Sequence, residues 1–224
     1  MTEALRAKQS RPESELGLSV NGAYLIPDPS GLLYWPDQQV LIAADMHFEK
    51  GSSYAMRGVA LPPYDTRSTL NVLAEAVRRY APKTIIALGD SFHDRNGADR
   101  LEEADREVIY TLTKCHRFVW ITGNHDPAPP PKVGGEVSDE LSIGPLIFRH
   151  EPLALPQAGE IAGHLHPCAK LNSRGRMLRR RCFATDGVRL VMPSLGAYTG
   201  GLNVLDSAFS TLFQSNLVAW MLGQ

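Results

Sequence analysis

Five short motifs in this chain hold the side chains that are best suited to metal chemistry. Six of the seven histidines lie in or beside them, together with three aspartates and one asparagine. Carboxylate, amide and imidazole groups supply the oxygen and nitrogen ligands that Mn²⁺, Fe and Zn²⁺ accept. In chain order the motifs are Asp45-Met46-His47, Gly89-Asp90, Gly123-Asn124-His125-Asp126, His150 and Gly163-His164-Leu165-His166.

Taken together, the motifs offer more metal ligands than one ion needs. Each motif alone is a weak signal, but their occurrence in this order, nearly always after an apolar run, is not expected of unrelated turns. Seven donors exceed the needs of one tetrahedral zinc ion. They suit two divalent metals that share a bridging carboxylate, an arrangement that hydrolyses phosphate esters. The seven candidate ligands are Asp45, His47, Asp90, Asn124, His150, His164 and His166.

The elements that must position these residues are predicted strands alternating with helices. The apolar runs Val40–Ala44, Thr84–Leu88 and Arg117–Ile121 each precede one motif. Helical patterns over about 65–80 and 98–115 separate the runs. The order βαβαβ predicts parallel strands with right-handed crossovers. Ligands of such sheets gather beyond the carboxyl ends of the strands, which is where the motifs fall.

The second half of the chain has a different pattern, with short strands separated by turns. We expect these strands to form a second sheet packed on the first. Apolar residues between Phe209 and Trp220 recur at helix-like spacing, and core packing explains them. The strands expected after the proline-rich loop at 127–135 are Leu146–Arg149, Glu160–Ala162, Arg181–Ala184, Arg189–Met192 and Asn203–Leu205.

Composition limits the classes of protein. A length of 224 residues suits a polar arm at 1–17 and one domain at 18–224. The net charge of −1 gives no global basic field, so a polyanion has to be bound by a local patch or by metals. Three dispersed cysteines predict no disulfide framework and favour a reducing cytoplasm. No signal peptide and no apolar run of about 18 residues is found, so we expect no membrane association.

The motifs resemble those of the calcineurin-like metallophosphoesterase superfamily. The resemblance implies an α/β fold, a two-sheet sandwich whose βαβαβ core has flanking helices and holds two metals at the strand ends. Asp90 would bridge the two ions. The first ion would be bound by Asp45, His47 and His166. The second would be bound by Asn124, His150 and His164.

The resemblance also implies which residues act on the substrate. A hydroxide between the metals would attack phosphorus while His125 faces the phosphate and assists the leaving group. Asp126 is a candidate for orienting a neighbour, although a turn carboxylate bonded to backbone amides is an equal alternative. His93, three residues after Asp90, resembles the histidine that assists near the phosphate in double-strand-break repair nucleases. The alternative for His93 is a histidine hydrogen-bonded at the start of a loop.

Segments that carry no metal ligand resemble the bacterial DNA ligase-associated metallophosphoesterase (PdeM) family. This resemblance implies a Mn²⁺-dependent phosphodiesterase or DNA endonuclease, with Fe or Zn²⁺ as other possible metals. The substrate would be single-stranded or damaged DNA, and the partners a DNA ligase and a helicase-like exonuclease. The segments are Leu33-Tyr34-Trp35-Pro36, Phe48-Glu49-Lys50-Gly51, Arg149-His150-Glu151-Pro152 and the run from Met192 to Leu202.

Two cations after the first motif are candidates for phosphate binding. We expect Arg57, together with Asn124, to bind substrate, whereas a plain surface charge is the favoured interpretation for Lys50. Two other functions stay open. One is a hydrolase of small phosphate compounds, such as a nucleotide or a lipid-sugar pyrophosphate. The other is a non-catalytic scaffold in a repair complex.

Overall fold

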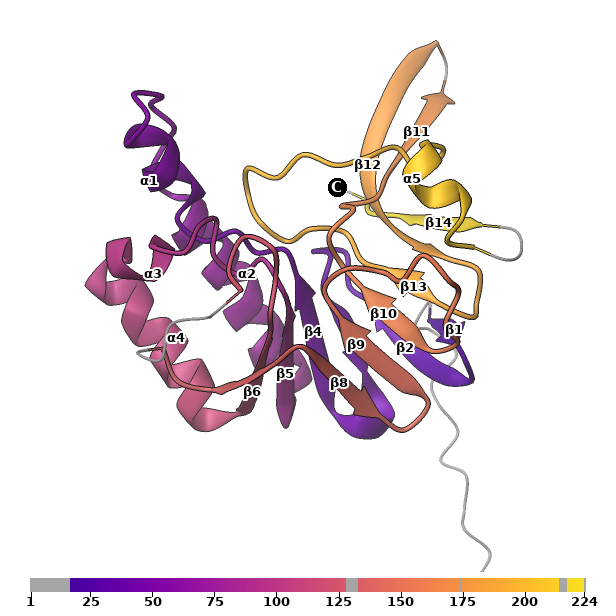
Figure 1. Ribbon diagram of the computed structural model, residues 1–224, viewed down its shortest axis with the longest axis horizontal. Helices are drawn as coiled ribbons and strands as arrows, with labels where there is room; N and C mark the ends of the chain where they lie inside the picture. Colours follow the sequence, from indigo (N-terminus) through magenta and orange to yellow (C-terminus); the bar gives the residue numbers. More distant parts are fainter. Residues whose placement is uncertain (1–16, 128–132, 174, 214–216, 224) are drawn as a thin grey trace, which may run out of the picture.

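Two mixed β-sheets pack face to face, and helices cover the outer face of the first sheet (Figure 1). The structure is a computed structural model that describes residues 17–127, 133–173, 175–213 and 217–223. The arm predicted at 1–17 lies almost wholly outside these residues. The architecture confirms the predicted α/β two-sheet sandwich.

The first sheet has seven strands whose spatial order follows the chain, from β1 to β7. The strands β4 to β7 are parallel, and helices connect β4 to β5 and β5 to β6. The strands are β1 (Leu18–Val20), β2 (Ala23–Pro27), β3 (Leu33–Trp35), β4 (Val40–Ala44), β5 (Thr84–Leu88), β6 (Arg117–Ile121) and β7 (Glu136–Ser138).

The helices near the first sheet are α1 (Lys50–Ala55), α2 (Asp65–Tyr80), α3 (Gly97–Arg100) and α4 (Glu103–Cys115), with a short 3-10 turn η1 (Pro36–Gln38). The predicted helix over 98–115 is therefore interrupted. Leu101 and Glu102 adopt extended backbone between α3 and α4, which turns the Leu101 side chain into the core with 5% of its surface exposed. The helix α1, which follows the first motif, was not predicted from the sequence.

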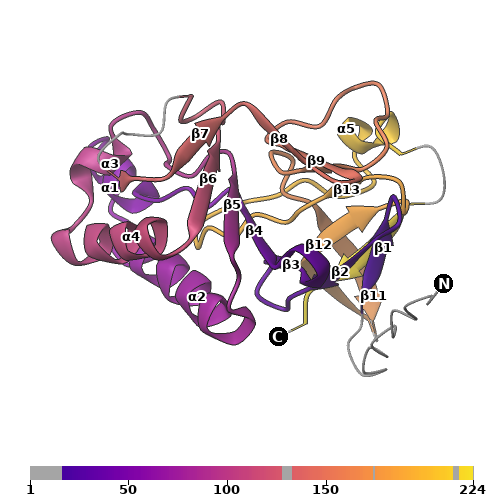
Figure 2. The same cartoon turned by 90° about the horizontal axis from the view of Figure 1, so that it is seen from below.

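The second sheet has the order β11-β12-β13-β10-β9-β8, with β14 paired to β12 (Figure 2). The strand predicted at 203–205 is wrong, because only an isolated bridge joins Asn203 to Cys168. The helix-like spacing after Phe209 produces the four-residue helix α5 and then the strand β14. The elements are β8 (Glu140–Ile143), β9 (Leu146–Arg149), β10 (Glu160–Ala162), β11 (Cys168–Ser173), β12 (Arg176–Thr185), β13 (Leu190–Val191), α5 (Ser207–Ser210) and β14 (Val218–Met221).

The central strand β4 is buried on both faces, which explains its continuous apolar sequence. Ile42 and Ala44 face the core between the two sheets, where they join Phe148 of β9. Leu41 and Ala43 face the other core, under α2 and α4. Each large side chain so buried stabilises the fold by roughly 1.5–3 kcal/mol. The strand that carries the first motif is therefore among the most firmly held parts of the molecule.

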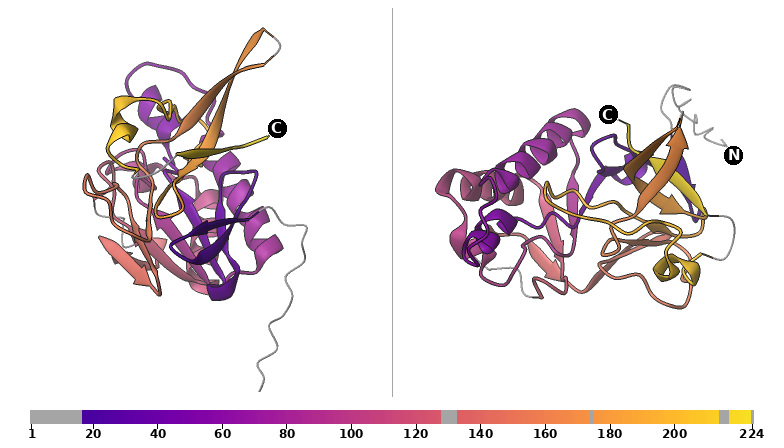
Figure 3. Two further views of the ribbon diagram at one scale, coloured as in Figure 1. Left: turned by 90° about the vertical axis from the view of Figure 1, so that its right-hand side faces the viewer. Right: turned by 90° about the horizontal axis from the view of Figure 1, so that it is seen from above.

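The β11–β12 pair stands out from the body of the domain (Figures 1 and 3). None of the helices in the described ranges is both long enough and apolar enough to cross a membrane.

Candidate metal centre

The ends of parallel strands place the motifs side by side. In the first sheet Ala44 is opposite Leu88, and Leu88 is opposite Ile121, so the segments after these strands leave the sheet together. In the second sheet Ala162 is opposite Arg149, so His150 and the motif after β10 are neighbours. The predicted convergence at strand ends is thus present in both sheets.

Backbone hydrogen bonds join the motifs across the two sheets. The His164 N–H donates to both carboxylate oxygens of Asp45, at 3.1 and 3.0 Å. The His47 N–H donates to the Asp90 carbonyl at 2.9 Å. Gly89 has a φ of +68°, and a side chain there would meet the ring of His150 at 2.4 Å. Only glycine allows His150 to approach this closely.

The backbone of the motifs is held in an uncommon conformation. Left-handed φ is sparsely populated by residues other than glycine and carries a cost of about 1–3 kcal/mol in strained cases. Such strain persists where the surrounding structure imposes it, often at functional sites. Five of the seven candidate ligands adopt it: Asp45 at 51°, His47 at 46°, Asp90 at 45°, His164 at 67° and His166 at 46°.

One group of potential ligands consists of Asp45, His47 and His166, whose ligand atoms lie within 4.8 Å of one another. His166 Nε2 is 3.3 Å from Asp45 Oδ1. His166 Nε2 and His47 Nδ1 are buried and make no hydrogen bond to described residues. Buried polar atoms without partners are costly, so this group is suited to binding a cation rather than to stabilising the empty fold.

A second group consists of Asp90, His150 and His164, again within 4.8 Å. His164 Nδ1 lies 3.2 Å from His150 Nε2 and 3.1 Å from the side-chain oxygen of Asn124. His150 Nδ1 donates to the Leu88 carbonyl at 3.1 Å, which directs Nε2 into the group. This arrangement, with one ring nitrogen held by a carbonyl and the other turned toward the neighbouring ligand atoms, is typical of metal-binding histidines.

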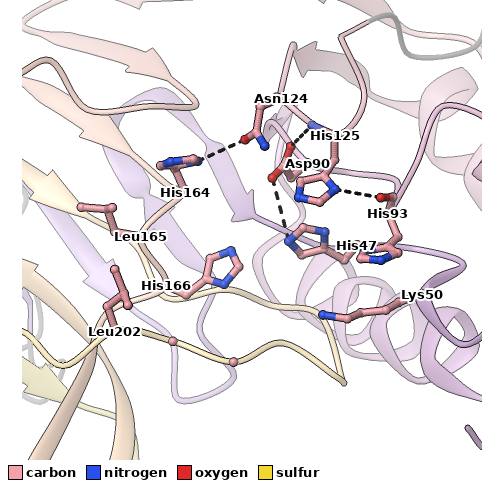
Figure 4. A pocket seen from close by; sticks show the side chains of 12 residues that line it. His47, Lys50, Asp90, His93, Asn124, His125, His164, Leu165, His166 and Leu202 are labelled. Atoms are coloured by element: carbon pink, nitrogen blue, oxygen red, sulfur yellow. Dashed lines mark hydrogen bonds and ion pairs between the residues drawn. The ribbon is translucent and has the colours of Figure 1, made fainter. Parts of the chain in front are cut away.

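Asp90 lies between the two groups. Its Oδ2 is 3.4 Å from His150 Nε2 in the second group and 4.0 Å from His47 Nε2 in the first. Its Oδ1 accepts the His125 N–H at 2.9 Å, which fixes the carboxylate (Figure 4). Asp90 thus occupies the position from which one carboxylate can reach two ions.

The protonation of these groups also suits cations. Burial raises the pKa of Asp90, but the His150 hydrogen bond and charge outweigh it and lower the value to about 2. Burial lowers the pKa of His47 to about 3 and also lowers that of His164. At neutral pH the site therefore has an anionic carboxylate at Asp90 and neutral imidazoles at His47 and His164. The residues present fit a pair of divalent metals.

His150 behaves differently from the other imidazoles. Burial lowers its pKa, but hydrogen bonding to Asp90 and the charges of Asp45 and Asp90 raise the value to about 9. A metal that binds at Nε2 must therefore displace a proton. Ligand deprotonation of this kind makes metal affinity increase with pH.

His125 and His93 lie beside the two groups and form with His47 a third cluster whose ring nitrogens lie within 4.8 Å of one another. Their rings stack with centroids 5.3 Å apart, and His47 is 5.2 Å from His125. The His125 Nδ1–H donates to the His93 carbonyl at 2.9 Å, which leaves Nε2 available for substrate. Burial, followed by the charges of Lys50 and His125, lowers the pKa of His93 to about 4.

The remaining predicted residues lie farther from the ligand atoms. Asp126 Oδ2 accepts the N–H groups of Ser91 and Phe92 at 2.9 and 3.1 Å. Asp126 therefore fixes the loop after Asp90 through backbone bonds, in the way considered for a turn carboxylate. Arg57 is exposed and does not line the cavity described below, although its charge lowers the pKa of His93.

The motifs open into a cavity of about 360 Å³ (Figure 4). Its walls also include Lys50, for which the sequence favoured a plain surface charge. Four further wall residues were not predicted from the sequence, namely Leu165, Gly200, Gly201 and Leu202. Leu165 stands between the two histidines of its motif, so its spacing from the motif was the only signal available.

Groups of carboxylate and imidazole ligands at the strand ends of a two-sheet sandwich are the arrangement of a metal-dependent phosphoesterase. Residues 39–184 match the calcineurin-like phosphoesterase family, and the chain belongs to that family. The crystal structure of Pseudomonas putida nuclease MPE is similar, with a TM-score of 0.70 and 28% sequence identity. The match covers 92% of this chain and 98% of that one. A search of curated proteins found no matching relative.

Proposed function

We propose that this protein is a two-metal phosphodiesterase that cleaves nucleic acid. The observation that carries the proposal is the position of Asp90 between two groups of ligands. The similarity to a nuclease over nearly the whole of both chains favours a phosphodiester substrate. The finer parts of the proposal are single-stranded or damaged DNA as substrate, Mn²⁺ as metal and a cytoplasmic repair system with a DNA ligase and a helicase-like exonuclease.

The two groups of ligands have separate tasks in this proposal. When bound, divalent ions supply positive charge for phosphate oxygens and lower the pKa of a bound water. Asp90 holds the two groups at a fixed separation. The first group would be Asp45, His47 and His166. The second would be His150 and His164 with the side-chain oxygen of Asn124.

His125 is the residue that we assign to the leaving group. Its Nδ1–H is held by the His93 carbonyl, so the ring cannot rotate without losing a hydrogen bond. Its Nε2 is the atom that can carry a proton to the departing alkoxide oxygen. The ring of His93 stacks on the ring of His125 and assists by positioning the His125 ring.

Substrate binding uses groups that the metals do not. The Asn124 side chain is exposed, and its oxygen faces His150 and His164. Its amide N–H groups are then available to a phosphate oxygen. Arg57 contributes positive charge near His93 from outside the cavity.

The test is a metal-dependence screen across substrates. Protein stripped with a chelator is supplied with Mn²⁺, Fe²⁺ or Zn²⁺. Each form is then assayed on bis(4-nitrophenyl) phosphate, single-stranded and duplex oligonucleotides, nucleotides and diphosphates. We expect Mn²⁺ to restore hydrolysis of the simple diester and of single-stranded DNA. Equal activity after chelation would exclude the metal mechanism. Faster turnover of nucleotides or diphosphates would favour the small-molecule hydrolase.

A further inference from the structure

A lysine outside the ligand groups faces the cavity. Lys50 is half-buried, lines the cavity wall, and turns its ammonium group inward (Figure 4). Across the described ranges no carboxylate forms an ion pair with it. Among the described residues, the only ring in contact with its Nζ is that of Tyr54, at 6.0 Å from the centroid. A half-buried lysine that faces a cavity in this way is not a plain surface charge exposed to solvent.

The backbone on both sides of Lys50 is anchored to the start of α2. The Glu49 N–H donates to Thr66 Oγ1 at 2.8 Å, and the Thr66 hydroxyl donates back to the Glu49 carboxylate at 2.9 Å. The Gly51 N–H donates to Asp65 Oδ2 at 3.0 Å. A side chain at Gly51 would meet Asp65 at 2.7 Å, so this close approach requires glycine. These contacts hold Lys50 at the first position of α1.

The surroundings of Lys50 call for an anion. Burial lowers its pKa, and the charge of Asp65 only partly opposes this. Its own charge lowers the pKa of His47 and of His93, so the ammonium group lies within electrostatic reach of the site. The candidate metal ligands already serve the phosphate that is cleaved. A cation beyond them is suited to a different negative group of the same substrate.

A row of aromatic side chains connects this position to the leaving-group side. The ring of His125 stacks on His93, which is 5.8 Å from Tyr54, and Tyr54 in turn lies beneath the Lys50 ammonium. A substrate that places its leaving group at His125 can therefore extend along these rings toward Lys50. A molecule with two phosphates would present its second negative charge farther along this path, near the Lys50 ammonium group.

We propose that Lys50 forms a subsite for a second phosphate group of the substrate, next to the phosphate that is hydrolysed. The inference rests on the proposed phosphodiesterase function and names a binding position that the function alone does not require. The second phosphate belongs either to the next linkage of a polynucleotide strand or to a compound that carries a diphosphate. Both sources present the same anion to the ammonium group.

The experiment compares substrates that differ by one phosphate, namely the dinucleotide TpT and the trinucleotide TpTpT, with thymidine diphosphate as a third. The variants are Lys50→Ala, Lys50→Arg and the matched control Lys114→Ala. Lys114 is an exposed lysine on α4 whose Nζ lies 5.8 Å from the ring of Tyr110, so its removal deletes a similar helical lysine–tyrosine pair. All four proteins are assayed with metal.

We expect wild type to prefer TpTpT over TpT, mainly through a lower KM. Lys50→Ala should lower the preference for TpTpT over TpT by about tenfold or more, because the variant loses a charge-assisted hydrogen bond. Lys50→Arg should keep most of it, and Lys114→Ala should match wild type. A larger effect of Lys50→Ala on the diphosphate than on TpTpT identifies the diphosphate as the source.

A binding measurement without catalysis provides the second readout. In chelator, the affinity for a dye-labelled oligothymidylate is followed by anisotropy at several salt concentrations. Removal of one phosphate contact flattens the plot of log affinity against log salt by about 0.7 for a single strand. We expect this change for Lys50→Ala and not for Lys114→Ala.

Failure of the subsite can be distinguished from failure of the function. Equal losses on TpT and TpTpT, or equal salt slopes for the two alanine variants, overturn the subsite while leaving a diesterase. If wild type with metal cleaves neither substrate, the proposed function itself is wrong, and the subsite falls with it.

Discussion

Asp28 and Asp90 are buried to the same extent, with 3% of each residue exposed, but their surroundings are different. Asp28 accepts hydrogen bonds from the backbone and hydroxyl of Ser30, from Arg79 and from Tyr80, at 2.6 to 3.0 Å. These bonds tie the turn after β2 to the end of α2. Asp90 instead accepts the His125 N–H and faces the Nε2 atoms of His47 and His150.

The difference separates a structural carboxylate from a functional one. Buried polar groups that are fully hydrogen-bonded hold a fold together, whereas buried groups without partners have a cost that binding can offset. Around Asp28 the protein supplies every partner. Around Asp90 the donors converge on space that a cation fits. The comparison therefore predicts that substitution of Asp90 lowers activity, whereas substitution of Asp28 lowers stability and leaves activity unchanged.

The largest effect is expected for Asp90→Asn. The amide loses the charge that faces both ligand groups, so the variant should bind metal poorly. Two metals supply several kcal/mol of charge stabilisation to the reaction, which corresponds to a loss of about a thousandfold or more. Metal analysis and diester turnover measure the effect. A fully loaded, active Asp90→Asn protein would remove the distinction between the two aspartates.

His125→Ala should give the next largest loss while leaving the metals in place. General acid catalysis contributes about 10²–10⁴-fold, and we expect kcat to fall within this range. The loss should be smaller for a substrate whose leaving group is nitrophenolate, because that group departs without a proton. Metal content of the variant is the control. A loss caused by missing metal would place His125 among the ligands instead.

The sequence predicted the part of the fold that depends on local pattern. The apolar runs at β4, β5 and β6 are buried strands because they lie in the middle of a sheet covered on both faces. A parallel strand that is buried on both faces is apolar at nearly every position, so its sequence alone is enough to predict it. The polar residues that follow are then expected at one edge, and the structure gathers them there.

The features that the sequence did not predict depend on contacts between distant segments. The apolar residues from Phe209 to Trp220 have helix-like spacing, but pairing of Trp220 with Phe183 of β12 makes the end of this segment the strand β14. Lys50 faces the cavity because Thr66 and Asp65, more than a dozen positions away, fix its neighbours. The left-handed backbone of the ligands also follows from tertiary bonds. The roles of the individual ligands stay predictions.

Asp126 is a third buried aspartate, with 2% exposed, and it sharpens the comparison through pH. Burial raises the pKa of Asp126 to about 7, against the hydrogen bonds from Phe92 and Ser91. The folded state therefore holds this proton more tightly than the unfolded state. Its contribution to stability is complete below pH about 4 and is lost as pH rises to about 7, by up to about 4 kcal/mol.

Asp126→Asn should accordingly remove this decline in the free energy of unfolding. Denaturant titrations of both proteins in chelator, between pH 4 and 8, measure the difference without interference from metal. The free energies of unfolding of the two proteins should converge toward low pH, where Asp126 is protonated. They should separate as pH rises and Asp126 loses its proton. Parallel curves would show that Asp126 is ionised throughout, as Asp28 is at neutral pH.

Asp28→Asn should have the smallest effect and the opposite pH dependence. Burial raises the pKa of Asp28, but bonds from Ser30 and Tyr80 and the charge of Arg79 outweigh it and lower the value. Its stabilisation is therefore present above pH about 3.8 and is lost as pH falls through the lower folded value. At pH 7 the variant should lose about 1–3 kcal/mol of unfolding free energy, and the gap should close on acidification.

Metal content and turnover of the folded Asp28→Asn protein should equal those of wild type, because Asp28 does not line the cavity. The measurement pairs denaturant unfolding at pH 7 and pH 3 with a diester assay. A stable but inactive Asp28→Asn protein would mean that the turn after β2 influences the metal centre. In that case the kind of partner around a buried carboxylate would not divide structure from function in this molecule, and Asp90 would have to be judged by its metal alone.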